Sequence, residues 1–193
     1  MTRIISGTAG GRRLKTPSGS GTRPTSDRVR EALFSGLESR EALSGAHVLD
    51  LYAGSGALGL EAASRGAASV LLVESDRRAA AVARENAASL GLASVSVRLG
   101  TAERLLEGAP TRAMDLVLAD PPYDIGEDAL AHVLALLGSG GWLAPGALLV
   151  VERSSRSPEP AWPAGLTSEG PRRYGETTLW FAGTDGRAPD PHD

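Results

Sequence analysis

The segment 48–61, VLDLYAGSGALGLE, constrains the fold more than any other part of the chain. An apolar run there contains Asp50 near its end and leads into three glycines, Gly54, Gly56 and Gly59. Glycines at this spacing let the backbone turn sharply, let a ligand approach the main chain, and let the following helix pack closely on a sheet. The segment therefore predicts a strand, a cofactor-binding loop and the start of a helix.

The acids that flank this loop narrow the choice of cofactor, because the glycines alone also fit the G-x-G-x-x-G pattern of dinucleotide-binding folds. Asp50 lies at the carboxyl end of the predicted strand, where a carboxylate attracts a cation and repels a pyrophosphate. A second apolar run, 70–73, ends in Glu74, at the place where an acid on the second strand binds a ribose diol. An ammonium, a ribose and no phosphate together describe S-adenosylmethionine.

Strands and helices alternate from residue 47 onward, which predicts right-handed βαβ units and a parallel sheet. The expected strands are 48–52, 70–74, 95–99, 114–119 and 147–151, and the expected helices are 56–65, 77–90, 102–106 and 126–137. We expect a hairpin from 3–6 and 13–15, a helix from about 26 to 39 capped by Thr25 or Ser26, a loop at 153–163, and antiparallel strands at 166–170 and 177–182. The predicted domains are a basic segment 1–40, a catalytic domain 41–183 and a disordered tail 184–193.

The sequence Asp120-Pro121-Pro122-Tyr123 directly follows the fourth predicted strand. Two consecutive prolines end the sheet and hold the backbone extended, so the acceptor oxygens of Asp120 and Pro121 are fixed at its carboxyl edge. An exocyclic base amine is a poor nucleophile, and two acceptors that hold its hydrogens aim the nitrogen lone pair while Tyr123 stacks on the base. A stiff turn with a core tyrosine is the structural alternative.

Charge is distributed unevenly along a chain whose net charge is -3. Residues 1–30 carry seven basic groups and one acid, a net charge of +6, and the remaining residues carry 13 basic and 22 acidic groups, a net charge of -9. The seven basic residues are Arg3, Arg12, Arg13, Lys15, Arg23, Arg28 and Arg30. Such asymmetry predicts a polyanion partner at one end of the chain, and a solvated arginine-rich surface is the alternative.

Several residue types and patterns are missing. The chain has no cysteine, which excludes disulfides, thiolate metal sites and the cysteine adduct that methylation of a pyrimidine carbon commonly needs. His47, His132 and His192 are too scattered to predict a metal site. No apolar run reaches the length of a membrane span and no signal peptide is recognisable, so we expect a cytoplasmic protein without a membrane or metal partner.

Five segments together resemble the bacterial ribosomal RNA small subunit methyltransferase D family. They are RIISGTAGGRRL at 3–14, TRPTSDRVREALF at 22–34, DLYAGSGALGLEA at 50–62, DPPY at 120–123 and RRYGETTLWF at 172–181. The first two are the more specific, because the glycine loop and DPPY occur in many amino-methyltransferases. The resemblance implies a Rossmann-like class I methyltransferase with a seven-stranded, mostly parallel sheet. It also implies methyl transfer from S-adenosylmethionine to the N2 amine of a guanine in 16S ribosomal RNA, within a small-subunit particle.

The family's functional residues carry over as follows. The resemblance puts Asp50, Tyr52, Gly54, Ser55, Gly56 and Glu74 at the cofactor, Asp120, Pro121 and Tyr123 at the target base, and Arg12, Arg13, Arg23, Arg28 and Arg30 at the RNA. Relatives often have an acid after the glycine at position 100, where this chain has Thr101, so adenine is expected to meet the Thr101 hydroxyl or the Ala102 backbone. Tyr52 replaces a common phenylalanine and adds a hydroxyl near the cofactor.

Three other functions fit parts of the sequence. An amino-methyltransferase acting on DNA or protein would keep both motifs, although it would normally need a target-recognition region of its own. An NAD-dependent oxidoreductase would use the glycine loop and Glu74 but has no role for the DPPY motif. A non-enzymatic ribosome-assembly factor would need the basic segment without the acceptor oxygens.

Overall fold

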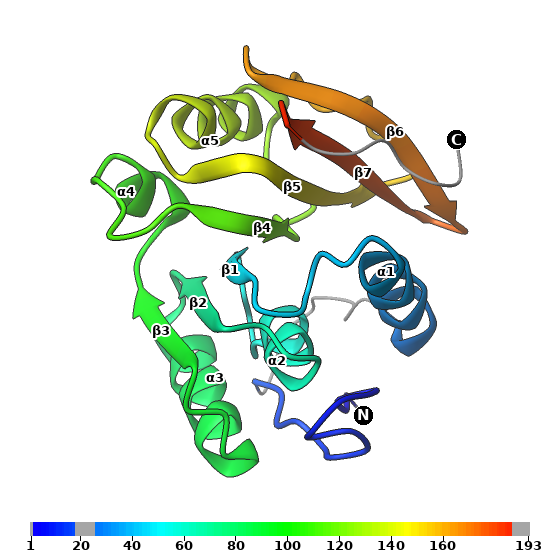
Figure 1. Ribbon diagram of the computed structural model, residues 1–193, viewed down its shortest axis with the longest axis vertical. Coiled ribbons are helices and arrows are strands. Elements are labelled where there is room, and N and C mark those ends of the chain that lie inside the picture. Colours follow the sequence, from blue (N-terminus) through cyan, green and yellow to red (C-terminus); the bar gives the residue numbers. More distant parts are fainter. Residues whose placement is uncertain (1, 18–25, 187–193) are drawn as a thin grey trace.

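The computed structural model describes residues 2–17 and 26–186, and it contains one seven-stranded mixed sheet with helices on both faces (Figure 1). The strand order is β3-β2-β1-β4-β5-β7-β6; the first five run parallel, β7 is antiparallel to β5, and β6 is antiparallel to β7. The strands are β1 (His47–Leu51), β2 (Ser69–Glu74), β3 (Val95–Leu99), β4 (Met114–Ala119), β5 (Leu143–Ser154), β6 (Leu166–Tyr174) and β7 (Thr177–Thr184). The helices are α1 (Asp27–Ser39), α2 (Ala57–Ser64), α3 (Arg77–Leu90), α4 (Ala102–Leu106) and α5 (Glu127–Ser139). The predicted α/β class and mostly parallel sheet are confirmed.

Two hydrophobic clusters fill the space between the sheet and its helices. Helices α1, α2 and α3 cover one face and α4 and α5 cover the other, as Figure 1 shows. Successive side chains of a strand point to opposite faces of the sheet and so belong to different clusters. In β4, Leu116 and Leu118 pack in the cluster that contains α1, while Val117 packs in the cluster that contains α5. Central strands buried on both faces read as continuous apolar runs, which is why the sequence pattern locates them well.

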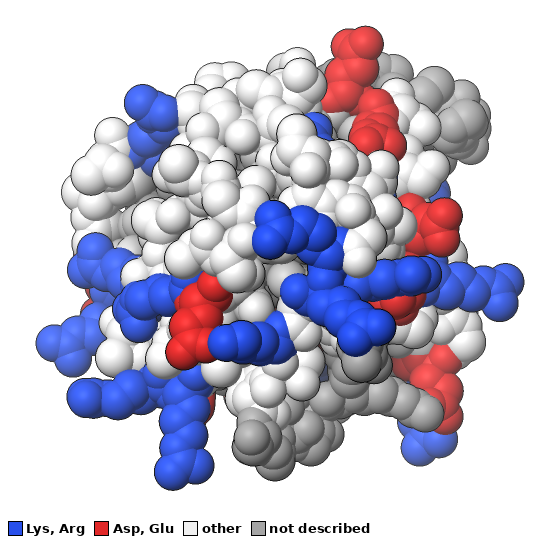
Figure 2. Space-filling model, turned by 90° about the horizontal axis from the view of Figure 1, so that it is seen from below, with Lys and Arg blue, Asp and Glu red and all other residues white. Residues whose placement is uncertain are grey.

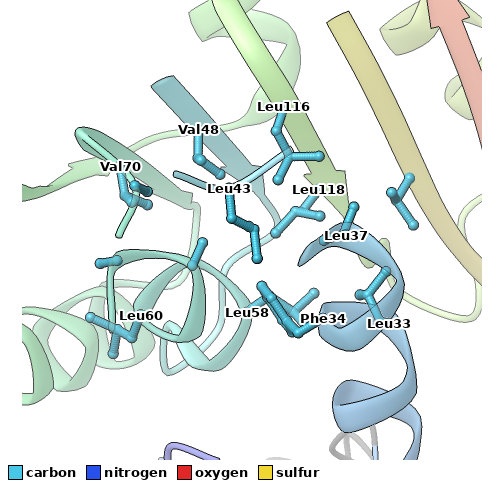
Figure 3. Packing of buried hydrophobic residues seen from close by; sticks show 14 of the residues in the cluster. Leu33, Phe34, Leu37, Leu43, Val48, Leu58, Leu60, Val70, Leu116 and Leu118 are labelled. Atoms are coloured by element: carbon cyan, nitrogen blue, oxygen red, sulfur yellow. The ribbon is translucent and has the colours of Figure 1, made fainter. Parts of the chain in front are cut away.

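Helix α1 begins where the sequence places a capping residue. The Ser26 hydroxyl accepts a hydrogen bond from the Val29 N–H at 3.2 Å, which satisfies one of the free amides of the first turn. Leu33, Phe34 and Leu37 recur at helical spacing and are buried against α2 and the sheet (Figure 3). The predicted helix is confirmed, with Ser26 as its cap; Thr25 lies outside the described residues.

The amino-terminal segment forms the predicted hairpin and belongs to the main core. Arg3 and Arg13 form an antiparallel bridge, flanked by the Ile4 N–H bond to the Arg12 carbonyl and the Leu14 N–H bond to the Thr2 carbonyl, both 2.9 Å. The side chains of Ile4 and Leu14 are buried in the same cluster as α1, α2 and α3. The hairpin therefore packs on the α/β fold and shares its core.

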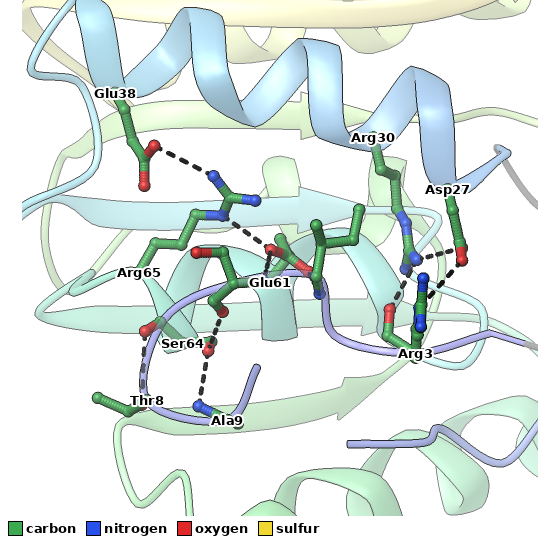
Figure 4. Close-up of polar contacts among 11 residues, drawn as sticks. Arg3, Thr8, Ala9, Asp27, Arg30, Glu38, Glu61, Ser64 and Arg65 are labelled. Atoms are coloured by element: carbon green, nitrogen blue, oxygen red, sulfur yellow. Dashed lines mark hydrogen bonds and ion pairs between the residues drawn. The ribbon is translucent and has the colours of Figure 1, made fainter. Parts of the chain in front are cut away.

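Two polar side chains of α2 hold the hairpin turn in place (Figure 4). The buried Glu61 carboxylate accepts the N–H groups of Ile5 and Ser6 at 2.8 and 3.0 Å. The Ser64 hydroxyl accepts from the Ala9 N–H and donates to the Ser6 carbonyl. These bonds satisfy backbone groups of the hairpin that no strand partner would otherwise pair.

Glycine is required at the hairpin turn. Gly7 has φ +83° and lies so close to α2 that a Cβ there would stand 1.9 Å from the Ser64 carbonyl oxygen. A side chain at this position would therefore have to displace the helix backbone. The GTAGG stretch thus serves close packing as well as turning.

The carboxyl-terminal strands are longer than predicted. β5 ends at Ser154, because β7 continues to pair with it as far as the Ser154–Thr177 register, so the expected loop at 153–163 begins later. The turn between β6 and β7 is at residues 175–176, and Thr184 belongs to β7 and not to a tail. The remainder of the predicted tail, 187–193, lies outside the described residues. None of the helices in the described ranges has the length and apolar character of a membrane span.

Candidate cofactor and acceptor site

The predicted cofactor and acceptor residues lie at or just after the carboxyl ends of β1, β2, β3 and β4, which meet along one edge because these strands are parallel. Asp50 pairs in register with Leu118, so Asp120 lies two residues farther along the neighbouring strand, roughly 7 Å at the rise of a strand. Ligands of open α/β sheets bind in this kind of crevice. The fold thus brings the glycine loop and the DPPY segment to adjacent strand ends.

The glycine loop has a backbone that only particular residues adopt easily. Gly54 and Gly56 have φ values of +57° and +89°, and no heavy atom from outside the loop lies within 4 Å of a Cβ added at Gly54. Gly59 has a different role, since a Cβ there would lie 2.2 Å from Leu72 Cδ2 of β2. Gly54 leaves the loop backbone accessible, whereas Gly56, where a Cβ would lie 2.9 Å from Leu72 Cδ1, and Gly59 let the start of α2 pack closely on the sheet.

Asp50 is a buried acid with one oxygen bonded to the start of α2. Its Oδ2 accepts the Gly59 N–H at 2.8 Å, whereas its buried Oδ1 has no hydrogen-bond partner among the described residues. The pKa of Asp50 is raised to about 7, chiefly by burial and also by the charge of Glu74, while the Gly59 N–H acts in the opposite direction. A cationic group beside Oδ1 would favour the charged carboxylate.

Glu74 ties the glycine loop to β2. Its Oε2 accepts the Gly54 N–H and its Oε1 accepts the Asp76 N–H, each at 2.7 Å. A carboxylate has about four acceptor positions, so two hydrogen bonds leave capacity for a diol. Glu74 therefore fits the predicted ribose contact, and it also orders the loop, which the sequence did not indicate.

Thr101 and Ala102, the residues expected to meet adenine, lie at the start of α4, and Tyr52 follows β1. Thr101 caps α4, with its hydroxyl accepting the Arg104 N–H at 3.2 Å, and the Ala102 side chain is buried. Tyr52 has φ +62° and a buried hydroxyl without a partner among the described residues. Burial and, to a smaller extent, the negative charge of Glu103 together raise the pKa of Tyr52 to about 12. Glu103, in the first turn of α4, is a further acid whose charge acts on Tyr52, and the sequence motifs did not point to it.

The DPPY segment projects beyond the sheet. Pro121 is buried and Asp120 is half-buried, while Tyr123 is 65% exposed. A core role for this tyrosine is therefore wrong. Behind the segment, the buried Arg153 of β5 forms an ion pair with Glu127 at the start of α5. This pair anchors the far end of the loop that carries Asp120 and Tyr123, and no motif pointed to it.

The predicted RNA-facing arginines are in different environments. Arg12, Arg13 and Arg28 are exposed, and Arg23 lies outside the described residues. Arg30 is 1% exposed and its Nη2 donates to the Arg3 carbonyl and to Asp27 Oδ1, both at 2.7 Å. It is therefore not part of the exposed basic surface, because positions 30, 33, 34 and 37 share the buried face of α1. That spacing was visible in the sequence.

Basic side chains extend beyond the hairpin. Figure 2 shows the face that carries the amino-terminal segment and α3, on which Lys and Arg outnumber Asp and Glu. Four arginines of α3 and β3 are exposed as well, although they belong to residues 31–193, which carry a net negative charge. They are Arg77, Arg78, Arg84 and Arg98. Among the described residues, no group of three metal-ligating side chains is present.

Comparison with known proteins identifies the family. A sequence model of the family described as conserved hypothetical protein 95 matches residues 2–183. The chain is 42% identical over 164 residues to ribosomal RNA small subunit methyltransferase D of Escherichia coli strain K12, covering 84% of this chain and 79% of that relative. The chain belongs to the ribosomal RNA small subunit methyltransferase D family.

Solved structures agree with the family assignment. A putative methyltransferase from Escherichia coli, yhhF, superposes with a TM-score of 0.84 at 36% identity, covering 96% of this chain and 98% of that chain. An RNA methyltransferase from Salinibacter ruber, solved with S-adenosyl-L-homocysteine, shares the fold at 20% identity, with a TM-score of 0.63 and coverage of 89% and 99%. The Rossmann-like methyltransferase fold expected from the sequence is confirmed.

Proposed function

We propose that this chain transfers a methyl group from S-adenosylmethionine to the exocyclic N2 amine of a guanine in 16S ribosomal RNA of the small subunit. One observation carries the proposal: a glycine loop between two acids and the DPPY acceptor segment lie at adjacent strand ends. A dinucleotide-binding site would account for the loop but not for the acceptors. The Escherichia coli relative, by its name, methylates small-subunit ribosomal RNA.

The loop fits a cationic nucleoside cofactor. Asp50 Oδ1 is a buried acceptor without a partner among the described residues, which suits the ammonium of the methionine part. Glu74 retains acceptor capacity for the ribose diol, and Gly54 leaves the backbone open. When bound, the cofactor supplies an electrophilic methyl group on a sulfonium. Neutral or cationic ligands suit this acidic pocket, and a pyrophosphate does not.

The DPPY segment would orient the acceptor. The Asp120 carboxylate and the Pro121 carbonyl would each accept one N2 hydrogen, which keeps the nitrogen lone pair directed at the crevice. Tyr123 presents an exposed ring on which a base taken out of its stack can lie. Positioning of this kind is what a weakly nucleophilic amine needs.

The function can be tested directly by mapping N2-methylguanine in 16S RNA from a strain that lacks this protein. We expect one guanine to lose its methyl group and to regain it when the gene is restored, but not when the gene carries Asp120→Ala. Unchanged methylation of every guanine would contradict the proposal.

Cofactor binding is expected to release protons near neutral pH. Because burial raises the pKa of Asp50 to about 7, part of the protein carries a protonated Asp50 there, and a bound cation favours the carboxylate. S-adenosylhomocysteine should therefore release up to about half a proton at pH 7 and bind more weakly as the pH falls below 7. Calorimetry in buffers of different ionisation enthalpy measures this release. The Asp50→Asn variant should not show it, and equal release by both proteins would rule out the assignment.

The exposed arginines of the hairpin are expected to supply salt-dependent RNA affinity. Replacing Arg12 and Arg13 together by alanine should weaken binding to small-subunit particles and reduce the slope of log affinity against log salt by roughly one to two, one counterion per lost phosphate contact. The affinity for S-adenosylhomocysteine should not change. Binding is measured across a salt series, with cofactor titration alongside.

A second variant separates charge from hairpin docking. Arg12 Nη2 also donates to the Ser89 carbonyl of α3 at 2.6 Å, so its loss could loosen the hairpin, whereas Arg13→Ala alone tests exposed charge. Arg112→Ala is the matched control, because this exposed arginine lies outside the hairpin and contacts His47 at the amino end of β1. If Arg13→Ala and Arg112→Ala leave the same slope, the hairpin arginines are ordinary surface charges.

A further inference from the structure

Asn86 of α3 connects the basic hairpin to the glycine loop. It is 1% exposed, and it is the one asparagine in a chain that contains no glutamine. Its Oδ1 accepts the Lys15 N–H at 2.9 Å, while its Nδ2 donates to the Lys15 carbonyl at 3.0 Å and to the Ser55 carbonyl at 2.9 Å. One buried amide group thus binds the main chain of two segments 40 residues apart in sequence.

The Ser55 end of this bridge acts on the part of the loop with the greatest conformational freedom. Ser55 lies between Gly54 and Gly56, which both have positive φ and impose little steric preference of their own. Other side chains fix the amides around it: Glu74 accepts from Gly54 and Asp50 accepts from Gly59. Asn86 is the side chain that orients the Ser55 carbonyl, so the peptide between the two glycines depends on it.

The other end of the Asn86 bridge is the main chain of Lys15, at the end of the hairpin. Residue 15 follows Arg12 and Arg13 and precedes the segment that leads to α1. The Lys15 main-chain bonds to Asn86 are partly buried, whereas the Lys15 ion pair with Glu85 is exposed on both sides and contributes little. A bound polyanion that holds the hairpin in this position would therefore also hold Asn86, through both polar groups of the Lys15 backbone.

We propose that Asn86 is a positioning residue that couples the hairpin to the cofactor loop, so that binding of RNA and binding of the cofactor strengthen each other. The inference rests on the proposed function, because it takes the hairpin as the RNA-contacting surface and the loop as the cofactor site. Coupling of this kind is reciprocal: the factor by which RNA raises cofactor affinity equals the factor by which cofactor raises RNA affinity. A purely structural asparagine would stabilise both segments without linking their ligands.

Amide hydrogen exchange of the unaltered protein gives the first test. Adding S-adenosylhomocysteine should slow exchange of the Lys15 amide, which donates to Asn86, by about fivefold. The Gly11 amide is the internal control, because it bonds to the Ile4 carbonyl within the hairpin and has no link to Asn86. Equal slowing of both amides would indicate general stabilisation, and no slowing of Lys15 would show that the loop does not act on the hairpin; either result overturns the proposal.

The second test compares variants by the factor with which small-subunit particles raise the affinity for S-adenosylhomocysteine. The affinity for S-adenosylhomocysteine is measured with and without saturating small-subunit particles. We expect particles to raise it about fivefold or more in the unaltered protein, and this factor to fall to about one in Asn86→Ala. Glu85→Ala is the matched control, since it removes an exposed contact of Lys15 with the same helix but leaves the bridge to Ser55 intact. Its factor should stay unchanged.

The outcomes separate this inference from the proposed function. If S-adenosylhomocysteine does not bind the unaltered protein, the proposed function fails and the coupling fails with it. If it binds with the same affinity in the presence and absence of particles, the function stands and the coupling is wrong. If Asn86→Ala does not fold, the exchange experiment on the unaltered protein decides.

Discussion

Replacing Asp120 by alanine is expected to reduce methyl transfer on the order of 10²-fold or more, while affinity for S-adenosylmethionine stays nearly unchanged. Asp120 follows β4, whereas the side chains that fit the cofactor, Asp50 and Glu74, lie at the carboxyl ends of β1 and β2, so Asp120 would orient the acceptor amine without holding the donor. Single-turnover rates with small-subunit particles measure the first quantity, and calorimetry measures the second.

Asp124→Ala provides the control for that experiment, because Asp124 is an exposed carboxylate in the same loop. We expect its effect to be small, since nothing directs it to the acceptor. A loss of S-adenosylmethionine affinity as large as the loss of rate would move Asp120 from the acceptor to the cofactor. Asp120→Asn is expected to retain part of the rate, because its amide oxygen can still accept one hydrogen bond.

The second large effect is expected from Glu74→Ala, which should weaken cofactor binding by about 1.5 to 3 kcal/mol through loss of charge-assisted hydrogen bonds to the ribose. The structure adds a further contribution of the same sign, because the Gly54 amide also loses its acceptor and the loop becomes less ordered. Calorimetric titration with S-adenosylhomocysteine measures the loss.

Two further variants show how the Glu74 effect arises. Glu74→Gln keeps an oxygen for the Gly54 amide but removes the charge, so it should fall between the alanine variant and the unaltered protein. Glu85→Ala removes an exposed carboxylate of α3 and should leave the affinity unchanged. Unchanged affinity in Glu74→Ala would mean that the ribose lies elsewhere.

The sequence by itself determined the features that depend on neighbours along the chain. The glycine loop, Asp50 and Glu74 follow from local spacing, and the order of elements follows from hydrophobic periodicity and capping residues such as Ser26. Parallel strands bring their carboxyl ends together, so the sequence also predicted that Asp120 and the loop would lie at one sheet edge. These predictions needed only short-range rules and one topological rule.

Only the tertiary structure decided which polar groups are buried and what they contact. Arg30 occupies the apolar face of α1 and donates to the Arg3 carbonyl. Asn86 and Glu61 bind backbone groups of a hairpin that is distant in sequence. A polar residue in a helix has the same local signature whether it faces solvent or a distant backbone, because burial and hydrogen bonding are set by the segment packed against it. β5 extends beyond its predicted end at residue 151 for the same reason. The backbone groups of its last residues are paired by β7, which comes from another part of the chain.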